Sequence, residues 1–320
     1  MSILITGAAG FIGSNLAKTL VDDNKSVIGI DNLLRGSLSN LNSILDNTNF
    51  KFFKEDINNY GSFKDKVKNI HLHDPVTEVW HLAANSDIPA GIADANVDLT
   101  YTFMTTFNTL KLMKDLKVSV IAFASSSAVY GDHGKNKLHE DMGPLFPISN
   151  YGAMKLASEA AISAAVESDI EKAFIFRFPN VIGTPATHGV ILDFIKKLKN
   201  TPNHLDVLGN GTQQKAYLYV DELIDAMLLI RHKSNEKINY FNIGANDAGV
   251  TVRFIAEQVV KVVSPNAKIN FGDENRGWIG DVPQFSYSID KLLSLGWRPK
   301  ISSSESIIKA IKQILINENI

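Results

Sequence analysis

A strand-like segment, residues 2–6, leads into three glycines whose spacing suits a phosphate-binding turn. Gly7, Gly10 and Gly13 form a GxxGxxG pattern at the start of a region with helical periodicity. Such glycines let backbone N–H groups approach a pyrophosphate, and the helix N-terminus adds unpaired donors and the positive end of its dipole. Asp31 closes the next predicted strand, 18 residues after Gly13. A carboxylate there favours the ribose hydroxyls of NAD and repels the 2′-phosphate of NADP.

Tyr151 and Lys155 are four residues apart on a predicted helix, so their side chains share one face. A lysine ammonium near the tyrosine oxygen favours the phenolate and makes the tyrosine a usable base near neutral pH. Upstream, the run VIAFA ends in Ser125, Ser126 and Ser127, at the carboxyl end of a predicted strand where ligands bind in such folds. The Ser, Tyr and Lys residues together suit a proton relay that oxidises an alcohol beside a nicotinamide. We expect at least one of the three serines to cap the strand end instead.

The elements that must position these residues alternate short apolar runs with helical periodicities, which indicates βαβ units. We predict six strands of one sheet, at residues 2–6, 26–31, 49–54, 76–83, 118–125 and 173–178. The fold class is therefore α/β, a doubly wound parallel Rossmann sheet with a second, smaller α/β substrate domain. We assign the NAD-binding domain to residues 1–180 with about 217–240, and the substrate domain to residues 181–216 and 241–320. The long connection 131–150 suits a lid or a binding loop.

Composition excludes several classes of protein. Lys and Arg number 32 against 34 Asp and Glu, so the net charge of −2 gives no basic excess for nucleic acid. The chain has no cysteine, which excludes disulfides, thiolate nucleophiles and Cys-ligated zinc. No apolar run is long enough to span a membrane and no signal sequence is apparent, so we expect a cytoplasmic protein without a membrane partner. The segment His71 to Asp74 is interpreted as a solvated turn rather than a metal site, and His81 as a core histidine.

In many short motifs the chain resembles a known family, the extended short-chain dehydrogenase/reductases that act on nucleotide sugars. This epimerase/dehydratase group includes UDP-glucose 4-epimerase, and the resemblance covers essentially the whole chain. The motifs that carry it, in order, are TGAAGFIG (6–13), DN (31–32), DI (56–57), HLAA (81–84), SSSAVYG (125–131), YGAMK (151–155), RFPNVIG (177–183), GNGTQQK with YVDE (209–222), NIG (242–244), and RGWIGDVP (276–283) with LGWRP (295–299).

The resemblance implies a role for each matching residue. It implies that a tightly bound NAD contacts the glycine turn and the strand ends, and that Asp56 and Ile57 hold its adenine. The cofactor residues are Gly7, Gly10, Phe11, Ile12, Gly13, Asp31, Asn32, Asp56, Ile57, Leu82, Ala83, Ala84, Tyr151 and Lys155. It implies that Ser126, Tyr151 and Lys155 are catalytic, and that a nucleotide-diphosphate sugar is the substrate. The substrate residues are Ser126, Ser127, Asn180, Lys215 and Arg276, and no metal is implied.

Positions at which this chain departs from the family pattern limit which reactions we expect. Related 4,6-dehydratases carry Asp and Glu where this chain has Ser127 and Ala128, so we do not expect dehydration. Lys215 stands where arginine is usual, which keeps the charge but loses the bidentate fork. We expect oxidation at the sugar C4, as a 4-epimerase of carbohydrate biosynthesis. The alternatives are a C4 dehydrogenase that releases a 4-keto sugar and NADH, a non-enzymatic NAD-sensing protein on the same fold, and an NADPH-dependent carbonyl reductase, which Asp31 opposes.

The predicted helices near 96–116 and 150–167 carry more small and apolar residues than one buried face needs. Relatives pair these helices across a dimer axis. We therefore expect a homodimer, or a larger homo-oligomer built on it. The residues concerned are Met104, Phe107, Leu110, Ala160, Ala161, Ala164 and Ala165.

Overall fold

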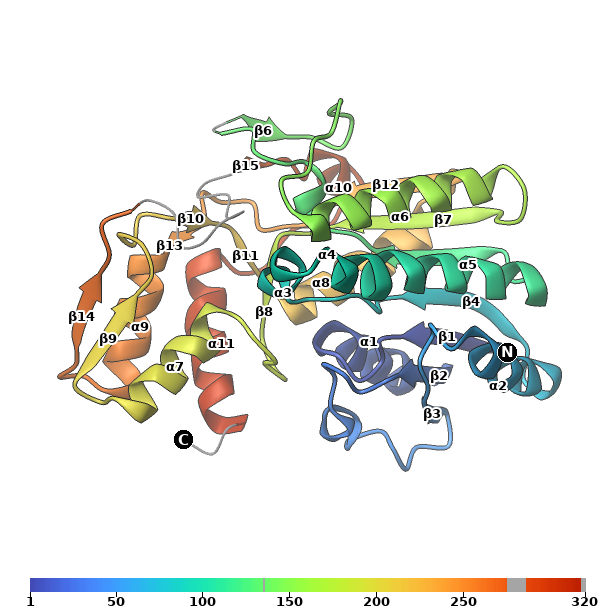
Figure 1. Cartoon of the computed structure of the whole chain (residues 1–320), viewed down its shortest axis with the longest axis horizontal. Coiled ribbons are helices and arrows are strands. Elements are labelled where there is room, and N and C mark those ends of the chain that lie inside the picture. Colours follow the sequence, from blue (N-terminus) through green and yellow to red (C-terminus); the bar gives the residue numbers. More distant parts are fainter. Residues whose placement is uncertain (135, 275–285, 318–320) are drawn as a thin grey trace. The chain divides into compact units, whose positions relative to one another are not determined.

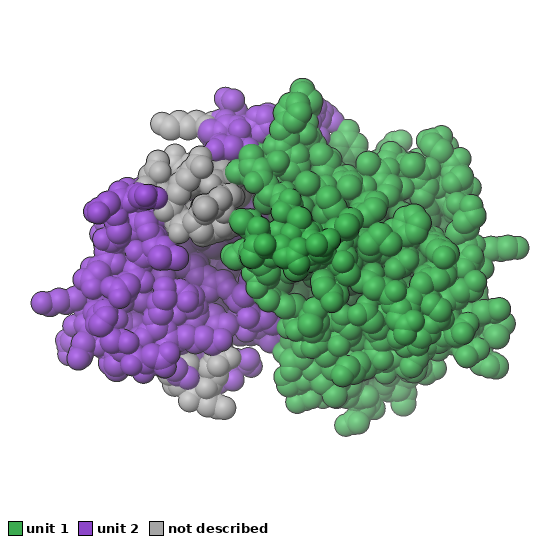
Figure 2. All heavy atoms as spheres, viewed as in Figure 1, with its two compact units in different colours: residues 1–131, 144–178, 224–241 green, residues 132–143, 179–223, 242–320 purple. Residues whose placement is uncertain are grey.

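The computed structural model describes residues 1–134, 136–274 and 286–317, and these form two compact units (Figure 2). Unit 1 consists of residues 1–131, 144–178 and 224–241, and unit 2 consists of residues 132–143, 179–223 and 242–320. The chain therefore passes between the units several times. The sequence analysis placed residues 132–143 in the first domain, whereas their short strand pairs within unit 2.

Unit 1 is built on a seven-stranded sheet in the order β12-β7-β5-β4-β1-β2-β3. The strands are β1 (Ser2–Thr6), β2 (Ser26–Asp31), β3 (Phe50–Lys54), β4 (Val76–His81), β5 (Val120–Ala124), β7 (Lys172–Arg177) and β12 (Ile238–Asn242). The pairs from β7 to β3 are all parallel. β1 and β5 are almost continuously buried, as expected for strands that helices cover on both faces. The doubly wound Rossmann sheet predicted from the sequence is confirmed.

One strand of this sheet was predicted in the wrong place. The sequence analysis gave six strands for this sheet, none of them near residue 240, and assigned residues 241–320 to the smaller domain. The structure places β12 at the edge of the seven-stranded sheet, next to β7. Ala173 of β7 donates a hydrogen bond to the Lys237 carbonyl, 2.8 Å away, at the start of this edge. A short strand after a helix gives no sequence signal of the sheet that it joins.

Helices and turns of unit 1 complete the layers around the sheet (Figure 1). They are α1 (Phe11–Asp22), η1 (Leu38–Leu41), α2 (Tyr60–His73), α3 (Ile88–Ala93), α4 (Ala95–Asp98), the π-helical η2 (Leu99–Met104), α5 (Thr105–Leu116), η3 (Ser127–Val129) and α6 (Asn150–Val166). α5 and α6 lie side by side. Apolar side chains from the strands and helices form one core, which includes Leu4, Ile28, Phe63, Val79, Leu112, Phe123 and Ile162. The helix α8 (Val220–Lys233) begins in unit 2 and continues into unit 1.

Unit 2 combines short paired strands with three longer helices. Its helices are α7 (Val190–Asn200), α9 (Val252–Val263), α10 (Asp290–Ser294) and α11 (Ser303–Asn317). Its strands are β6 (Lys137–Leu138), β8 (Asn180–Ile182), β9 (His204–Val207), β10 (Gln214–Lys215), β11 (Tyr217–Tyr219), β13 (Val250–Thr251), β14 (Lys268–Phe271) and β15 (Ser286–Tyr287). They pair as β10-β13, β11-β8, β14-β9 and β15-β6. Residues 131–150 were predicted to form a lid or a binding loop. Part of this segment, residues 132–143, instead contributes a strand, β6, that pairs with β15.

Within the described ranges, no helix combines the length and the apolar character that a membrane span needs. The same residues contain no group of three or more His, Cys, Asp or Glu side chains that could hold a metal ion. The residues of the predicted solvated turn have partners in the fold. His71 accepts a hydrogen bond from the Val76 N–H at 3.1 Å, and Asp74 accepts one from the Ser26 hydroxyl at 3.0 Å.

Candidate functional site

The glycine turn after β1 is packed too closely for side chains. Gly7 has a φ of +72°, a left-handed conformation that glycine adopts without strain. A Cβ on Gly13 would lie 2.0 Å from the Gly7 carbonyl oxygen. Gly10 is the N-cap of α1 and offers no side chain to the first N–H groups of the helix. The start of α1 therefore has no side-chain cap on its first N–H groups and lies at the positive end of the helix dipole, which fits a pyrophosphate. The first helical residues are Phe11 and Ile12.

Asp31, at the end of β2, is buried, and each of its carboxylate oxygens already accepts one hydrogen bond. Oδ2 accepts the Ala9 N–H at 3.0 Å, and Oδ1 accepts the Leu33 N–H at 2.8 Å. Burial raises the pKa of Asp31, and the two backbone hydrogen bonds oppose that rise. Because an ionised carboxylate accepts about four hydrogen bonds, each oxygen keeps capacity for one hydroxyl. This arrangement fits the two ribose hydroxyls of a dinucleotide.

The predicted adenine residues follow β3, beside Asp31. The Asn32 side-chain amide donates to Asp56 Oδ2 at 3.2 Å, and the Asn58 N–H donates to Asp56 Oδ1 at 2.8 Å. These contacts fix the Asp56 carboxylate at the same edge of the sheet as the end of β2. Ile57 is buried next to it. The structure thus brings the predicted adenine residues together.

The segment that follows β4 lies against the end of β1. The Leu82 N–H donates to the Thr6 carbonyl at 3.1 Å, and the Ala83 N–H lies 3.4 Å from the Thr6 hydroxyl. A Cβ on Gly7 would lie 2.8 Å from the Ala83 nitrogen. Residues 82–84, which were predicted to contact the cofactor, therefore lie directly beside the glycine turn.

His81 is a core residue, as predicted. It is fully buried, with Thr6 Oγ1 2.7 Å from Nδ1 and Thr106 Oγ1 3.0 Å from Nε2. Burial, together with the positive charge of Lys155, lowers the pKa of His81 to about 3. The ring is therefore neutral at physiological pH and serves as a structural link between β1, β4 and α5.

The relay residues come together at the end of β5 and the start of α6. The Ser126 hydroxyl accepts the Ala128 N–H at 3.2 Å, which caps η3, and its side chain hydrogen-bonds Tyr151. A Cβ on Gly152 would lie 2.4 Å from the Ala128 carbonyl oxygen, so a glycine lets the first turn of α6 approach this segment. Lys155 is buried, and its Nζ donates to the Ala124 carbonyl at 2.7 Å.

The electrostatics of the relay differ from the sequence expectation. Burial raises the pKa of Tyr151 to about 12, while the hydrogen bond with Ser126 lowers it and the charge of Asp98 raises it further. Burial lowers the pKa of Lys155 to about 7, against the negative charges of Glu159 and Asp98. Lys155 Nζ lies 5.8 Å from the centre of the Tyr151 ring. The protein's own side chains therefore do not bring the pKa of Tyr151 close to 7.

The three serines differ in their contacts. Ser125 is buried and donates a hydrogen bond to Glu159, so we interpret it as the structural member of the three. Ser126 faces Tyr151. Ser127 begins η3, and its N–H donates to the Phe178 carbonyl at 3.1 Å. Its side chain is half-buried.

The sequence analysis missed two buried carboxylates near Lys155. Glu159 lies one helical turn after Lys155 and forms a buried salt bridge with Arg177, with Oε2 2.6 Å from Nη2. The spacing of Glu159 from Lys155 was a signal that could have found it. Asp98 comes from a different helix, α4, and is fully buried. Its burial depends on contacts distant in sequence, so no local pattern indicated it.

Two of the predicted diphosphate contacts, Asn180 and Lys215, lie in unit 2, whereas the predicted substrate residues Ser126 and Ser127 lie in unit 1. Asn180 is on β8, and its Nδ2 is buried without a hydrogen-bond partner among the described residues. A buried amide donor of this kind suits a ligand acceptor. Lys215 is on β10 and is half-buried. Arg276, the third of the predicted phosphate contacts, lies outside the described residues.

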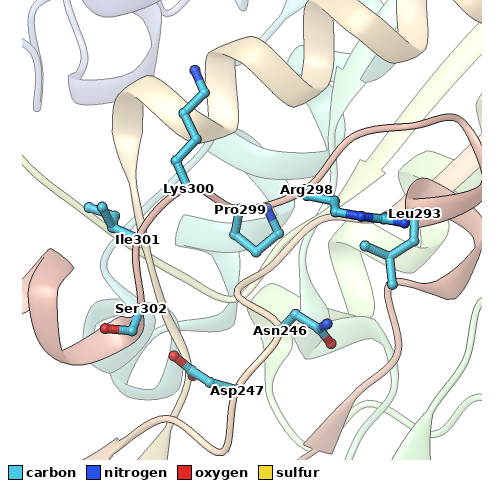
Figure 3. A pocket seen from close by; sticks show the side chains of 8 residues that line it. All are labelled: Asn246, Asp247, Leu293, Arg298, Pro299, Lys300, Ile301 and Ser302. Atoms are coloured by element: carbon cyan, nitrogen blue, oxygen red, sulfur yellow. The ribbon is translucent and has the colours of Figure 1, made fainter.

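A surface hollow of about 530 Å³ in unit 2 contains none of the predicted site residues (Figure 3). Its lining residues are Asn246, Asp247, Leu293, Arg298, Pro299, Lys300, Ile301 and Ser302. Asp247 in this hollow accepts hydrogen bonds from the backbone N–H and the hydroxyl of Ser303, both at 2.6 Å, at the start of α11. Its carboxylate therefore stabilises a helix start, and we assign the hollow no part in the chemistry.

Comparison with known proteins agrees with this geometry. Residues 3–244 match the family described as "NAD dependent epimerase/dehydratase family". A UDP-galactose 4-epimerase structure is 31% identical, with a TM-score of 0.85 and 99% of both chains covered. The UDP-glucuronic acid 4-epimerase of Bacillus cereus, in complex with UDP-glucuronic acid and NAD, is 26% identical, with a TM-score of 0.86, 99% of this chain and 100% of that chain covered. The dTDP-D-glucose 4,6-dehydratase of Homo sapiens is 27% identical over 97% of this chain and 89% of its own length.

The matched segment includes the glycine turn, Asp31, the serine segment and the Tyr151–Lys155 pair. The similarity to these solved structures extends over almost the whole chain, so it includes the residues of unit 2 as well. The chain therefore belongs to the NAD dependent epimerase/dehydratase family.

Proposed function

We propose that this protein is a nucleotide-sugar 4-epimerase, which oxidises the sugar at C4 with tightly bound NAD and then reduces the 4-keto sugar from its other face. The observation that carries the proposal is the relay of Ser126, Tyr151 and Lys155 beside a glycine turn that fits a dinucleotide. Family membership and the similarity to two 4-epimerase structures support it. We also propose that the protein acts in the cytoplasm, in carbohydrate biosynthesis, which is consistent with this class of substrate.

The NAD-holding residues are those at the carboxyl edge of β1, β2 and β4. The glycine turn would bind the pyrophosphate, Asp31 the adenosine ribose, Asp56 and Ile57 the adenine, and residues 82–84 the side of the cofactor. Lys155 would bind the nicotinamide ribose. When bound, NAD supplies the hydride acceptor and donor, and its oxidised ring supplies a positive charge.

Each relay residue has a defined task in the proposed reaction. Tyr151 takes the proton of the C4 hydroxyl as the hydride leaves C4, and it returns a proton when the ketone is reduced. Ser126 holds the C4 oxygen by a hydrogen bond. Lys155 presents positive charge to this region and favours the ionised form of Tyr151. Protons and electrons balance over the cycle, because both return to the sugar.

The nucleotide diphosphate would be bound by Asn180, Lys215 and Arg276. The unpartnered amide of Asn180 supports this assignment for one of the three. Ser127 would contact the sugar beside Ser126. Dehydration is disfavoured by Ser127 and Ala128, because neither side chain can act as the acid or base that expels water.

The second candidate is a C4 dehydrogenase that uses the same residues and releases the 4-keto sugar with NADH. The Tyr151→Phe variant tests the relay common to both reactions, because it removes the hydroxyl and keeps the ring. We expect turnover to fall by about 10² to 10⁴-fold while nucleotide-sugar binding survives. Wild-type turnover in this variant would refute the mechanism.

Product analysis separates the two reactions. The protein is incubated with UDP-, GDP-, CDP- and dTDP-sugars while absorbance near 340 nm is followed. An epimerase forms the C4 epimer with no net NADH, whereas a dehydrogenase accumulates a keto sugar and stoichiometric NADH. Neither product from any of these sugars would refute the substrate class.

We also propose a homodimer, or a larger homo-oligomer built on it, through the α5 and α6 face. Phe107 on α5 is 48% exposed, and Ala160 and Ala164 on α6 are exposed. Small residues on one helix let a second helix approach closely, and the exposed phenylalanine supplies apolar area. Light scattering that finds only a monomer at micromolar concentration would refute this assembly.

A further inference from the structure

A buried polar network adjoins the turn that carries Ser126, and no step of the proposed reaction uses it. The network is centred on Glu159 of α6, whose side chain is 8% exposed. Glu159 Oε1 accepts the Ser125 hydroxyl. Arg177 donates to Oε1 through Nε at 3.0 Å and to Oε2 through Nη2 at 2.6 Å. Buried hydrogen bonds of this kind, when both partners are satisfied, rigidify the segments that they join.

The network binds both ends of the short helix η3. Ser126 is the N-cap of η3 and Tyr130 is its C-cap. Ser125, directly before the N-cap, is bound by the Glu159 carboxylate. At the other end, the Tyr130 hydroxyl accepts a hydrogen bond from Arg177 Nη1 at 3.0 Å. Because Arg177 is itself paired with Glu159, one carboxylate links the residues on both sides of Ser126.

The same segment contacts the first two turns of α6, where the other relay residues lie. Lys155 Nζ donates to the Ala124 carbonyl at 2.7 Å, two residues before Ser126. A Cβ on Gly152 would lie 2.4 Å from the Ala128 carbonyl oxygen, two residues after Ser126. Ser126 therefore lies between two points at which this segment meets the helix. A shift of the segment along α6 would change the distance between Ser126 and the relay residues of the helix.

We propose that Glu159 is a positioning residue of the relay, which fixes Ser126 through the hydrogen bonds on both sides of that serine. Ser126 thereby keeps its hydrogen bond with Tyr151. The inference rests on the proposed function, because there the two hydroxyls act on one sugar oxygen. Glu159 touches neither sugar nor cofactor in this proposal and acts through the backbone of the serine segment. Misplacement of a reacting group by about 1 Å can cost about 10²-fold in rate, so a small displacement has a large effect.

The test is the Ser125→Ala variant, which removes one link of the network and orphans no charge. Glu159 keeps its salt bridge with Arg177 in this variant. The negative charge that Glu159 presents to Lys155 is therefore unchanged, and only the hydrogen bond to the serine segment is lost. An effect on the relay then reports geometry and not electrostatics.

The position of Ser126 is followed through Tyr151 in the protein as purified, without added substrate. The tyrosines are labelled as 3-fluorotyrosine, and the ¹⁹F resonance of Tyr151 is assigned by its absence in Tyr151→Phe. Ser126→Ala gives the reference position of this resonance when the hydrogen bond is lost. We expect the resonance in Ser125→Ala to move from the wild-type position towards this reference.

Where a nucleotide sugar turns over, the kinetic constants give a second readout. We expect kcat of Ser125→Ala to fall by about 10 to 100-fold while KM stays close to its wild-type value. Such a split indicates misplaced reacting groups. A serine with a merely structural role would change the free energy of unfolding and leave kcat of the folded protein unchanged.

Ser158→Ala is the matched control, because Ser158 is also a buried serine and directly precedes Glu159 on α6. Its hydroxyl donates to the Met154 carbonyl at 2.8 Å, so the hydrogen bond that is removed lies within one helix. We expect the Tyr151 resonance and kcat to stay as in the wild type. A folded Ser125→Ala protein with an unmoved Tyr151 resonance, or with an unchanged kcat, would overturn the proposal.

Tyr130→Phe covers the case in which Ser125→Ala does not fold. It removes the hydroxyl that Arg177 binds at the other end of η3 and keeps the ring. The Tyr151 resonance should again move towards its position in Ser126→Ala, and an unmoved resonance would overturn the proposal. Because this measurement needs no turnover, absence of epimerase activity would count against the proposed function and not against the positioning of Ser126.

Discussion

Removing the Arg177 guanidinium should destabilise unit 1 more than any surface substitution. Arg177 donates to Glu159 through Nε at 3.0 and 3.3 Å and through Nη2 at 2.6 Å, and Nη1 donates to the Tyr130 hydroxyl at 3.0 Å. The exposed fractions of the Arg177 and Glu159 side chains are both 8%. In Arg177→Met the Glu159 charge stays buried, and among the described residues the Ser125 hydroxyl is its remaining hydrogen-bond partner.

The expected cost follows from that uncompensated charge. Breaking a buried ion pair by removing one partner typically costs about 3–5 kcal/mol, whereas replacing both partners with apolar side chains is often close to neutral. The double variant Glu159→Met/Arg177→Met should therefore be more stable than Arg177→Met alone. The difference between the two variants measures the penalty of the orphaned carboxylate.

Urea titration followed by far-UV circular dichroism gives the loss of unfolding free energy. Because the chain has two units, hydrogen exchange of the peptides from α6 and β7 should accompany it, to show that unit 1 is the part affected. A double variant that is as unstable as Arg177→Met, or less stable, would refute the reasoning. A single variant that loses less than about 1 kcal/mol would also refute it, because surface pairs already reach that value.

Three further outcomes follow from the site. Asp31→Asn should weaken NAD binding by about 10 to 100-fold in calorimetry, because charge-assisted hydrogen bonds are worth about 1.5–3 kcal/mol each. Gly13→Ala should abolish NAD binding or folding, since its Cβ would lie 2.0 Å from a carbonyl oxygen, whereas Gly61→Ala, with no atom within 4 Å, should leave both unchanged. Stability should fall as the pH drops below about 6.5 and towards 3, because the unfolded chain protonates His81 before the folded chain does, and His81→Asn should flatten this part of an acid titration.

The elements that carry the site were predictable because their signals are local. The glycine turn, the acid at the end of β2 and the YxxxK face each depend on residues close in sequence, and a parallel sheet brings their strand ends to one edge. β12 was not assigned to this sheet and β6 was not predicted as a strand, for the opposite reason. Each is short, and its partner strand is distant in the chain, β7 for β12 and β15 for β6.

Charge was the least predictable property of the site. Asp98 has nothing in its own segment to distinguish it from a solvated acid, since Asn85 and Gly91 enclose it from other parts of the chain. The sequence expectation that Lys155 alone adjusts Tyr151 neglected desolvation. Burial acts on both groups, and it drives the pKa of the tyrosine up and that of the lysine down.

This pair of shifts suits a relay that must release and recover the same proton. With a pKa of about 12, Tyr151 holds its proton until positive charge is present close to it. An oxidised nicotinamide carries such a charge and a reduced one does not. Tyr151 should therefore be a stronger base while the cofactor is oxidised and the sugar is an alcohol. It should be a stronger acid once the cofactor is reduced and the sugar is a ketone. Lys155 contributes to both states only while it is protonated, and with a pKa of about 7 it depends on nearby carboxylates for that proton.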